Sequence, residues 1–361
     1  MNHLQKDILN LEIKTLSPVA ILNDSNNKLS PYIDIVKDKD EFVLLDIDKI
    51  ADILINDEEY YNKYLQILRN KRGNSRDKYT IRNLLQDKHI KLEEVEAGRI
   101  KCGCNIRGNV EINTCIKSKG IPYIPGSSLK GSIRTAVLYN EIEDKKTVVD
   151  KRKIFYKEYV GQDIFRREPR RVQEDIFKNL IVRDTEIDDS VKRSIYEARS
   201  INIYKDINSE KLNLDMEMLL ESIDKNQVLY SQMILKNEFF KKKALFYKIN
   251  NFYEKVINKE LEEISKVRFN EKNILINEYN LLLDKIREFK RDNNGFISRV
   301  GKLKGFFSNT LAAELSDDEI YSLVTRLKKK REKGEFPTTK WVISSDNSIK
   351  GTFGWVEVKE I

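Results

Sequence analysis

The chain has 361 residues, of which 40% are hydrophobic and 34% are charged. This composition can bury one large domain with insertions, or two smaller domains that share an interface. No run approaches the roughly 18 apolar residues of a membrane span, and no apolar block follows a basic start at the N-terminus, so we expect a soluble cytoplasmic protein without membrane contact. The net charge of +8 and the pI of about 9.0 favour a polyanionic partner.

Cysteine and histidine are scarce, which excludes several kinds of chemistry. Cys102, Cys104 and Cys115 are close in sequence but lack the paired spacing and the histidines of a zinc site, so we expect buried free thiols. Only His3 and His89 could serve as an imidazole base or metal ligand. We therefore expect no resident metal, no cofactor and no histidine-dependent catalysis.

The first part of the chain mixes strands and helices. Residues 9–22 predict a strand interrupted at Ser17-Pro18, and residues 41–54 pass from a strand into a helix. Asp46 or Asp48 would cap that helix. We expect a second helix over residues 57–70, a loop over 71–78 and a further helical stretch over 79–96.

The hydrophobic period changes at Gly98. Residues 98–118 alternate apolar and polar side chains around Arg107-Gly108-Asn109, which predicts a β-hairpin. A helix should follow to about residue 141, since a set of apolar residues falls on one of its faces. These residues are Leu129, Ile133, Ala136 and Val137.

The rest of the chain begins with a basic loop and ends on strands. The loop spans residues 144–171 and includes Lys145, Lys146, Lys151, Arg152, Lys153, Arg166, Arg167, Arg170 and Arg171. We expect strands in 176–187 and 198–207, helix over most of 216–292, a helix over 316–334 and a terminal hairpin around Asp346-Asn347. The order indicates an α+β protein with an inserted helical subdomain.

The stretch IPYIPGSSLKGSIRTAV, residues 121–137, is the strongest candidate binding segment, and we call it the Gly126 loop. Pro125-Gly126 would make a turn, Ser127 or Ser128 could cap or donate, and Lys130 and Arg134 are one helical turn apart, as in a phosphate site. The spacing is not that of a Walker A loop, because Lys130 precedes the second glycine. A capped helix start with two solvated cations is the alternative.

A second candidate is SRVGKLKGFFSNT, residues 298–310, which we call the Gly301 loop. It interleaves Arg299, Lys302 and Lys304 with glycines and two phenylalanines, a composition that suits single-stranded RNA. The alternative is a corner between elements with at least one buried phenylalanine. A third candidate is FPTTKW, residues 336–341, which follows the basic run RLKKKREKG. The alternative, and the usual explanation of such a run, is a solvated charged helix end.

Candidate catalytic acids are Asp24, Asp34 and Asp184. A metal-dependent nuclease would need a second acid or a base at a suitable distance, and the sequence places none beside them. Asp184, at the end of a strand, is better explained as a turn or capping residue.

The sequence resembles the RAMP superfamily of CRISPR effector proteins in several stretches. These are LEIKTLSPVAILNDSN, the Gly126 loop, NLIVRDTEI, the Gly301 loop and FPTTKWV…GTFGWVEV. Their order is similar to that in subunit five of type III-A (Csm) complexes. The resemblance implies a ferredoxin-like, RRM-type core with a large inserted helical subdomain. On this basis we expect residues 1–215 to form the core, 216–292 the insert and 293–361 the C-terminal part of the core.

The resemblance also implies a function. It suggests a non-catalytic RNA-binding subunit that caps the guide-RNA filament at its 3′ side and supports guide-RNA maturation and complex assembly. Its partners would be the guide RNA, the backbone RAMP subunit, the small helical subunits and host nucleases. The RNA-binding residues carried over are Gly126, Ser127, Ser128, Lys130 and Arg134, with Arg299, Lys302 and Lys304 as a second site. A RAMP-type metal-dependent endoribonuclease, or a scaffold without RNA contact, remains the alternative.

Overall fold

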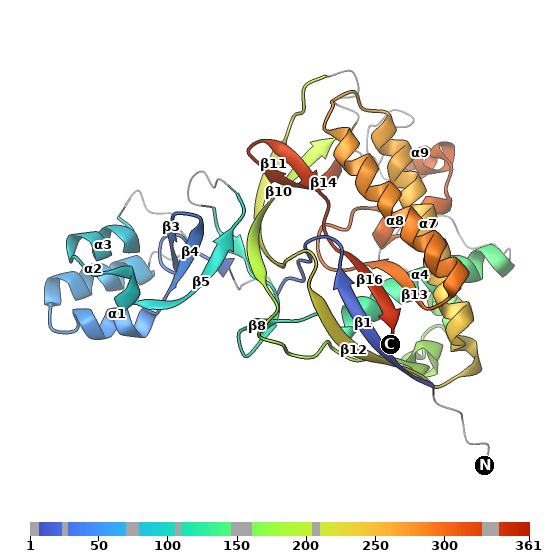
Figure 1. Cartoon of the computed structure of the whole chain (residues 1–361), viewed down its shortest axis with the longest axis horizontal. Coiled ribbons are helices and arrows are strands. Elements are labelled where there is room, and N and C mark those ends of the chain that lie inside the picture. Colours follow the sequence, from blue (N-terminus) through green and yellow to red (C-terminus); the bar gives the residue numbers. More distant parts are fainter. Residues whose placement is uncertain are drawn as a thin grey trace, which may run out of the picture.

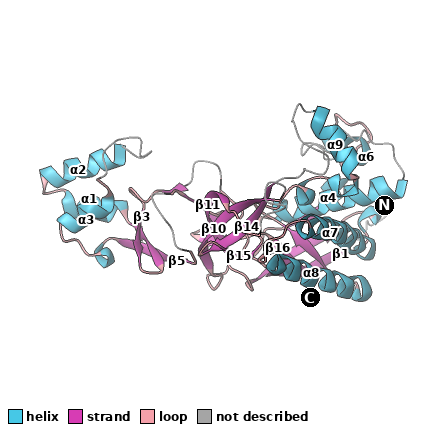
Figure 2. Cartoon of the chain, turned by 90° about the horizontal axis from the view of Figure 1, so that it is seen from above, coloured by secondary structure: helices cyan, strands magenta, loops and turns pink. Residues whose placement is uncertain are grey.

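A computed structural model describes residues 7–23, 28–69, 79–104, 110–145, 161–203, 210–326 and 339–361. The predicted loop at 71–78, the turn at 107–109, Asp24 and the lysines and arginine between 146 and 153 lie outside these residues. The chain is elongated, with one small helical lobe at one end and the larger helices at the other (Figures 1 and 2).

An antiparallel sheet forms the centre of the larger part. Its order is β13 (Gly295–Arg299), β16 (Trp355–Glu360), β1 (Asp7–Thr15), β12 (Val228–Leu235) and β9 (Leu180–Val182). Along β1, Leu9, Leu11 and Ile13 are buried while Ile8 and Asn10 are exposed, which is the alternation of a strand with one covered face.

Three long helices pack with this sheet. They are α4 (Gly126–Lys145), α7 (Lys242–Ser265) and α8 (Lys272–Asp292). The four apolar residues predicted for one face of α4 are all buried, so that prediction is confirmed. Phe246 of α7 contacts Phe296 of β13 with ring centroids 5.1 Å apart, within the main hydrophobic core.

A second sheet has the order β2 (Lys28–Leu29), β6 (Ile112–Asn113), β11 (Asp215–Ile223), β10 (Arg193–Asn202), β5 (Glu96–Cys102), β4 (Glu41–Leu45) and β3 (Ile35–Asp38). The hairpin of β14 (Thr339–Ser345) and β15 (Ser348–Gly351) pairs with β10. Positive φ angles of 54° at Asp346 and 57° at Asn347 make the predicted turn.

The small lobe contains α1 (Ile47–Leu54), α2 (Glu58–Arg69) and α3 (Ile81–Asp87), packed on their own hydrophobic cluster beside β3 to β5 (Figure 1). Asp46 caps α1 by accepting hydrogen bonds from the amides of Asp48 and Lys49, as predicted. The remaining short elements are β7 (Lys117–Ser118), β8 (Ile121–Pro122), α6 (Gln162–Phe165), α9 (Asp317–Arg326) and the 3₁₀ turns η1 (Leu92–Glu94), η2 (Val172–Glu174), η3 (Ile176–Asn179), η4 (Glu238–Phe240), η5 (Phe307–Asn309) and η6 (Ala312–Glu314).

The prediction of helix over most of residues 216–292 is wrong in its first third. Residues 215–235 form β11 and β12, one strand in each sheet, and the helices occupy only 242–292. The turn between the two strands has Asn226 in the left-handed region at φ 65°, a conformation that asparagine tolerates better than most residues.

Two further predictions are corrected by the structure. The helix predicted over 79–96 ends at Asp87, because His89 takes a left-handed φ of 53° and the chain enters β5 at Glu96. The alternation over 98–118 does contain strands, but they are not a hairpin. β5 pairs with β4 and β10, whereas β6 pairs with β2 and β11.

Candidate nucleic-acid interface

The start of α4 is held against strand β9 by the backbone of Gly126. A Cβ atom at this position would lie 2.1 Å from the carbonyl oxygen of Val182, so only glycine fits without displacing the strand. The Gly126 amide donates a hydrogen bond of 2.8 Å to Oδ1 of Asp184. Asp184 is therefore a capping residue, as predicted. Its carboxylate accepts the hydrogen bond that the Gly126 amide could otherwise donate to a phosphate.

The next residues of the Gly126 loop face outward. Ser127 is exposed and Ser128 is partly buried, and neither hydroxyl has a hydrogen-bond partner among the described residues. Lys130 is partly buried and makes no ion pair within the same ranges. Burial and the nearby Arg134 both lower the pKa of Lys130, as expected where a cation lies beside another cation. Ser127, Ser128 and Lys130 can thus reach an anionic ligand.

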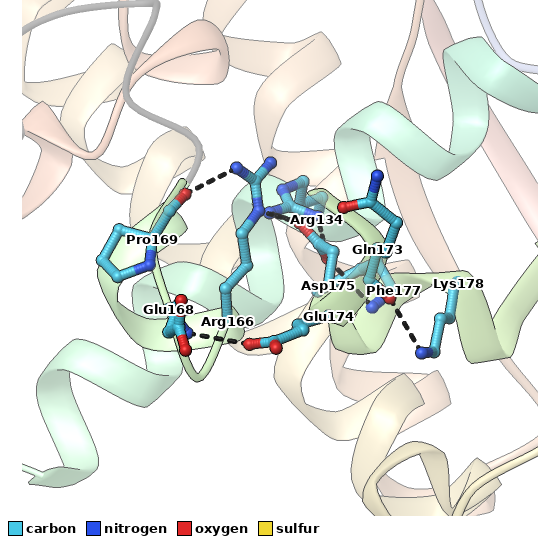
Figure 3. A network of polar contacts seen from close by, with 9 residues as sticks. All are labelled: Arg134, Arg166, Glu168, Pro169, Gln173, Glu174, Asp175, Phe177 and Lys178. Atoms are coloured by element: carbon cyan, nitrogen blue, oxygen red, sulfur yellow. Dashed lines mark hydrogen bonds and ion pairs between the residues drawn. The ribbon is translucent and has the colours of Figure 1, made fainter. Parts of the chain in front are cut away.

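Arg134, by contrast, is bound within the protein (Figure 3). Its Nη1 and Nη2 donate to the two carboxylate oxygens of Asp175 at 2.9 and 2.8 Å, a bidentate pair. The guanidinium lies 4.9 Å from the ring of Phe165 and 4.7 Å from that of Phe177, and the side chain is only 16% exposed. The prediction that Arg134 contacts RNA assumed a free guanidinium. In the structure this guanidinium is paired with Asp175 instead.

Asp175 also accepts a hydrogen bond of 2.9 Å from Nε of Arg166. Burial of Asp175 would raise the pKa of its carboxyl, but the hydrogen bonds from Arg134, Arg166 and the Phe177 amide outweigh burial and lower the pKa to about 2. The carboxylate is therefore charged at neutral pH and joins α4 to the segment that follows α6. We call Asp175, Arg134 and Arg166 the Asp175 clamp.

The Gly301 loop is fixed to the first strand region. Gly301 has a φ of +83°, and its Cβ would lie 2.5 Å from the carbonyl oxygen of Ala20. The Lys302 amide donates to that same oxygen at 2.7 Å. Phe307 is buried, which confirms the alternative expectation of a phenylalanine in the core.

The three cations of the Gly301 loop have different environments. Arg299 is 2% exposed, donates from Nε to the carbonyl of Phe353 at 2.9 Å and stacks 4.7 Å from the ring of Trp355, so it is a core residue. Lys302 is exposed. Burial and the charge of Arg299 lower the pKa of Lys304 to about 8. Only Lys302 is fully available to a ligand.

The two loops are connected through the core rather than merged into one surface. Oγ of Ser132, in α4, lies 2.8 Å from Oγ of Ser298, in β13, and both side chains are buried. Beneath the Gly301 loop, the buried carboxylate of Glu260 pairs with Lys340 and lies 3.8 Å from Arg299. Asp175 and Glu260 were missed from the sequence, because their partners are far away along the chain. Lys340 belongs to the third candidate segment, but its burial beside Glu260 was not expected.

The other candidate residues have structural roles. Asp34 accepts a 2.8 Å hydrogen bond from the Ser30 amide in a turn. The three cysteines are buried free thiols, as expected. In the described ranges, the carboxylates of Glu262, Glu263 and Asp317 come close together, but Lys259 and Lys266 pair with them, so they form an ion-pair cluster and do not include the predicted acids.

The fold and its loops define the class of protein. A family model for the RAMP superfamily matches residues 12–308, and the chain belongs to that superfamily. A chain in the cryo-EM structure of a Csm–crRNA–target RNA ternary complex of a type III-A CRISPR-Cas system superposes with a TM-score of 0.69 at 22% identity, covering 97% of this chain and 100% of that chain. The crystal structure of T. onnurineus Csm5 superposes with a TM-score of 0.64 at 21% identity, covering 96% and 99%.

At these identities the two structures establish a shared fold. No curated protein matches the sequence. Within the described ranges, no helix has both the length and the apolar character to cross a membrane.

Proposed function

We propose that the protein is a non-catalytic RNA-binding subunit of a type III-A CRISPR effector complex, where it caps the guide-RNA filament at its 3′ side and supports guide-RNA maturation and assembly. The observation that carries this proposal is the likeness of the whole chain to T. onnurineus Csm5, which covers nearly all of both chains. The exposed Ser127 and Lys302 and the unpaired Lys130 agree with it, because they place cations and a hydroxyl on the two loops that would meet RNA.

The proposed core is ferredoxin-like. The path β1, α4, β9, β12, the helix pair α7 and α8, and then β16 follows the β-α-β-β-α-β order, and the strands lie side by side as β16, β1, β12, β9. In this interpretation β13 is an added edge strand. On this path residues 216–292, expected from the sequence to be an insert, supply strand β12 and the helix pair of the core, so the proposed core is not confined to residues 1–215 and 293–361.

The proposed partners are the guide RNA, the backbone RAMP subunit, the small helical subunits and the host nucleases of guide maturation, in the cytoplasm. One solved relative is a chain of a complex with crRNA and target RNA, which supports the first of these partners. The excess of 66 lysine and arginine residues over 58 aspartate and glutamate residues suits an RNA partner.

RNA binding can be tested on the purified protein with a fluorescein-labelled oligouridylate and anisotropy measured over a series of salt concentrations. Lys130→Ala combined with Lys302→Ala should weaken binding and reduce the slope of log K against log salt by ~0.7 for each lost phosphate contact. The matched control is Lys225→Ala with Lys350→Ala, which removes two exposed lysines elsewhere. Unchanged affinity and slope in the first variant would show that the two loops do not hold RNA.

The alternatives give different outcomes in the same preparation. Incubation of labelled RNA with Mg²⁺ or Mn²⁺ should leave the RNA intact. Cleavage that Asp24→Ala, Asp34→Ala or Asp184→Ala abolishes would identify a nuclease instead, although the carboxylates of Asp34 and Asp184 already accept backbone hydrogen bonds. A scaffold without RNA contact would assemble with its partner subunits equally well after RNase treatment, whereas the proposed subunit should not.

A further inference from the structure

The segment RREPRR, from Arg166 to Arg171, is rich in arginine. None of its residues is among the predicted RNA-binding residues. We call it the arginine segment. Arg167 and Arg170 are exposed, and neither forms an ion pair with any residue in the described part of the chain. Arg171 differs, because its guanidinium pairs with Glu168 at 2.8 Å and Glu174 at 3.3 Å.

The backbone of the arginine segment is fixed by hydrogen bonds to neighbouring residues (Figure 3). Arg166 donates from Nη1 to the carbonyl of Pro169 at 2.9 Å and from Nε to Asp175, so it folds the segment back on the Asp175 clamp. The Glu168 amide donates to Glu174 at 3.0 Å and closes the loop on its other side. Its backbone is therefore held by specific bonds.

Aromatic rings support the segment from within. Phe165, just before it, lies 4.8 Å from Phe177, and Phe177 lies 5.0 Å from Phe240, each pair in an edge-to-face arrangement. The guanidinium of Arg134, in α4, lies against both Phe165 and Phe177, at 4.9 and 4.7 Å from their ring centroids. The arginine segment is therefore positioned directly on the helix that begins with the Gly126 loop.

Positive charge at this place exceeds the negative charge available to it. Asp175 is shared by Arg134 and Arg166, while Glu168 and Glu174 are engaged by Arg171. Arg167, Arg170 and Lys130 are left without a carboxylate from the described residues. Binding of an anion lowers the electrostatic repulsion among these cations. A guanidinium in addition offers a planar pair of N–H donors that matches two phosphate oxygens.

We propose that Arg167 and Arg170 contact phosphates of single-stranded RNA and, together with Lys130, extend the RNA path from the Gly126 loop across the arginine segment. This inference rests on the proposed RNA-binding function and assigns to it a second set of contacts. In this arrangement Arg134 is a positioning residue. It does not touch RNA, and it fixes the segment that does.

The test compares two double variants with equal loss of charge. Arg167→Ala with Arg170→Ala removes the proposed contacts, and Lys225→Ala with Lys350→Ala is the control; all four side chains are exposed. Binding of the fluorescein-labelled oligouridylate is measured by anisotropy from low to high salt. Two lost contacts at ~0.7 each should lower the salt slope by about 1.4, which corresponds to about 25-fold weaker binding at 0.1 M salt if the affinities converge at 1 M.

Each outcome decides a different point. If the wild type binds RNA and the arginine variant behaves like the control, the inference is wrong while the proposed function stands. If the wild type does not bind RNA, the proposed function itself fails. If the arginine variant keeps its RNA affinity but no longer joins its partner subunits, the segment recognises an acidic protein surface, and the RNA assignment is overturned.

Discussion

Replacing Gly126 with alanine should destabilise the protein, although alanine is the better helix former. The new Cβ would lie 2.1 Å from the Val182 carbonyl oxygen and 2.7 Å from the carbonyl carbon and oxygen of Arg183. These are backbone atoms of β9 and the residue after it, so they cannot rotate away. Overpacking of this kind costs ~1–3 kcal/mol.

Relief of the clash would move the start of α4 and stretch the 2.8 Å bond from the Gly126 amide to Asp184. A hydrogen bond to a charged group contributes ~1.5–3 kcal/mol, while the helix propensity of alanine returns at most ~1 kcal/mol. We therefore expect the free energy of unfolding to fall by about 2–4 kcal/mol, combining these terms. The assay is urea unfolding followed by far-UV circular dichroism, with the slope against urea checked for constancy.

Gly131, in the same loop, provides the matched control. It is exposed, and a Cβ there would meet nothing within 4 Å. Gly131→Ala should therefore be neutral or stabilise by up to ~1 kcal/mol. If Gly126→Ala is as stable as Gly131→Ala, the close approach of α4 to β9 does not explain the glycine at position 126.

Three other perturbations follow from the same structure. The pKa of Asp175 is lowered to about 2 from an ordinary value of 3.8, which corresponds to about 2 kcal/mol of folding stability. This contribution should be complete above about pH 4 and disappear as the pH falls towards 2. The difference in unfolding free energy between the wild type and Asp175→Asn, measured at several pH values, should therefore shrink over that range. Glu260→Gln removes the carboxylate that pairs with the buried Lys340 and one of the carboxylates near Arg299, and it should cost ~3–5 kcal/mol in urea unfolding; a loss below ~1 kcal/mol would contradict this. Asp184→Ala removes the cap of α4 and should cost ~1 kcal/mol in urea unfolding, and both the wild type and the variant should leave RNA intact in the Mg²⁺ assay; cleavage by the wild type that the variant lacks would show a catalytic role for Asp184 instead.

Local signals in the sequence were sufficient for several elements. The Asp346-Asn347 turn, the Asp46 cap and the buried face of α4 each depend on residues within a few positions of one another. Short-range turn chemistry and helical periodicity determine them. The extent of the helical region was overestimated, since β12 has few turn signals around it apart from Asn226.

The accessibility of the proposed binding residues could not be predicted in the same way. Arg134 is paired with a carboxylate 41 positions later, and Arg299 with a carbonyl 54 positions later. A sequence shows a cation beside glycine and serine, but it does not show whether a distant element covers it. Lys130 and Lys302 remain available only because the described elements leave them uncovered.

The position of β16 has a consequence for biosynthesis. β1 pairs on one side with β12 and on the other with β16, where Ile13 lies opposite Val358. One edge of β1 must therefore stay unpaired until residue 360 has left the ribosome. At ~5–20 residues per second, this takes roughly 20–70 s for a chain of 361 residues. The nascent protein carries an open strand edge throughout that time, and this strand is where misassembly during expression should begin.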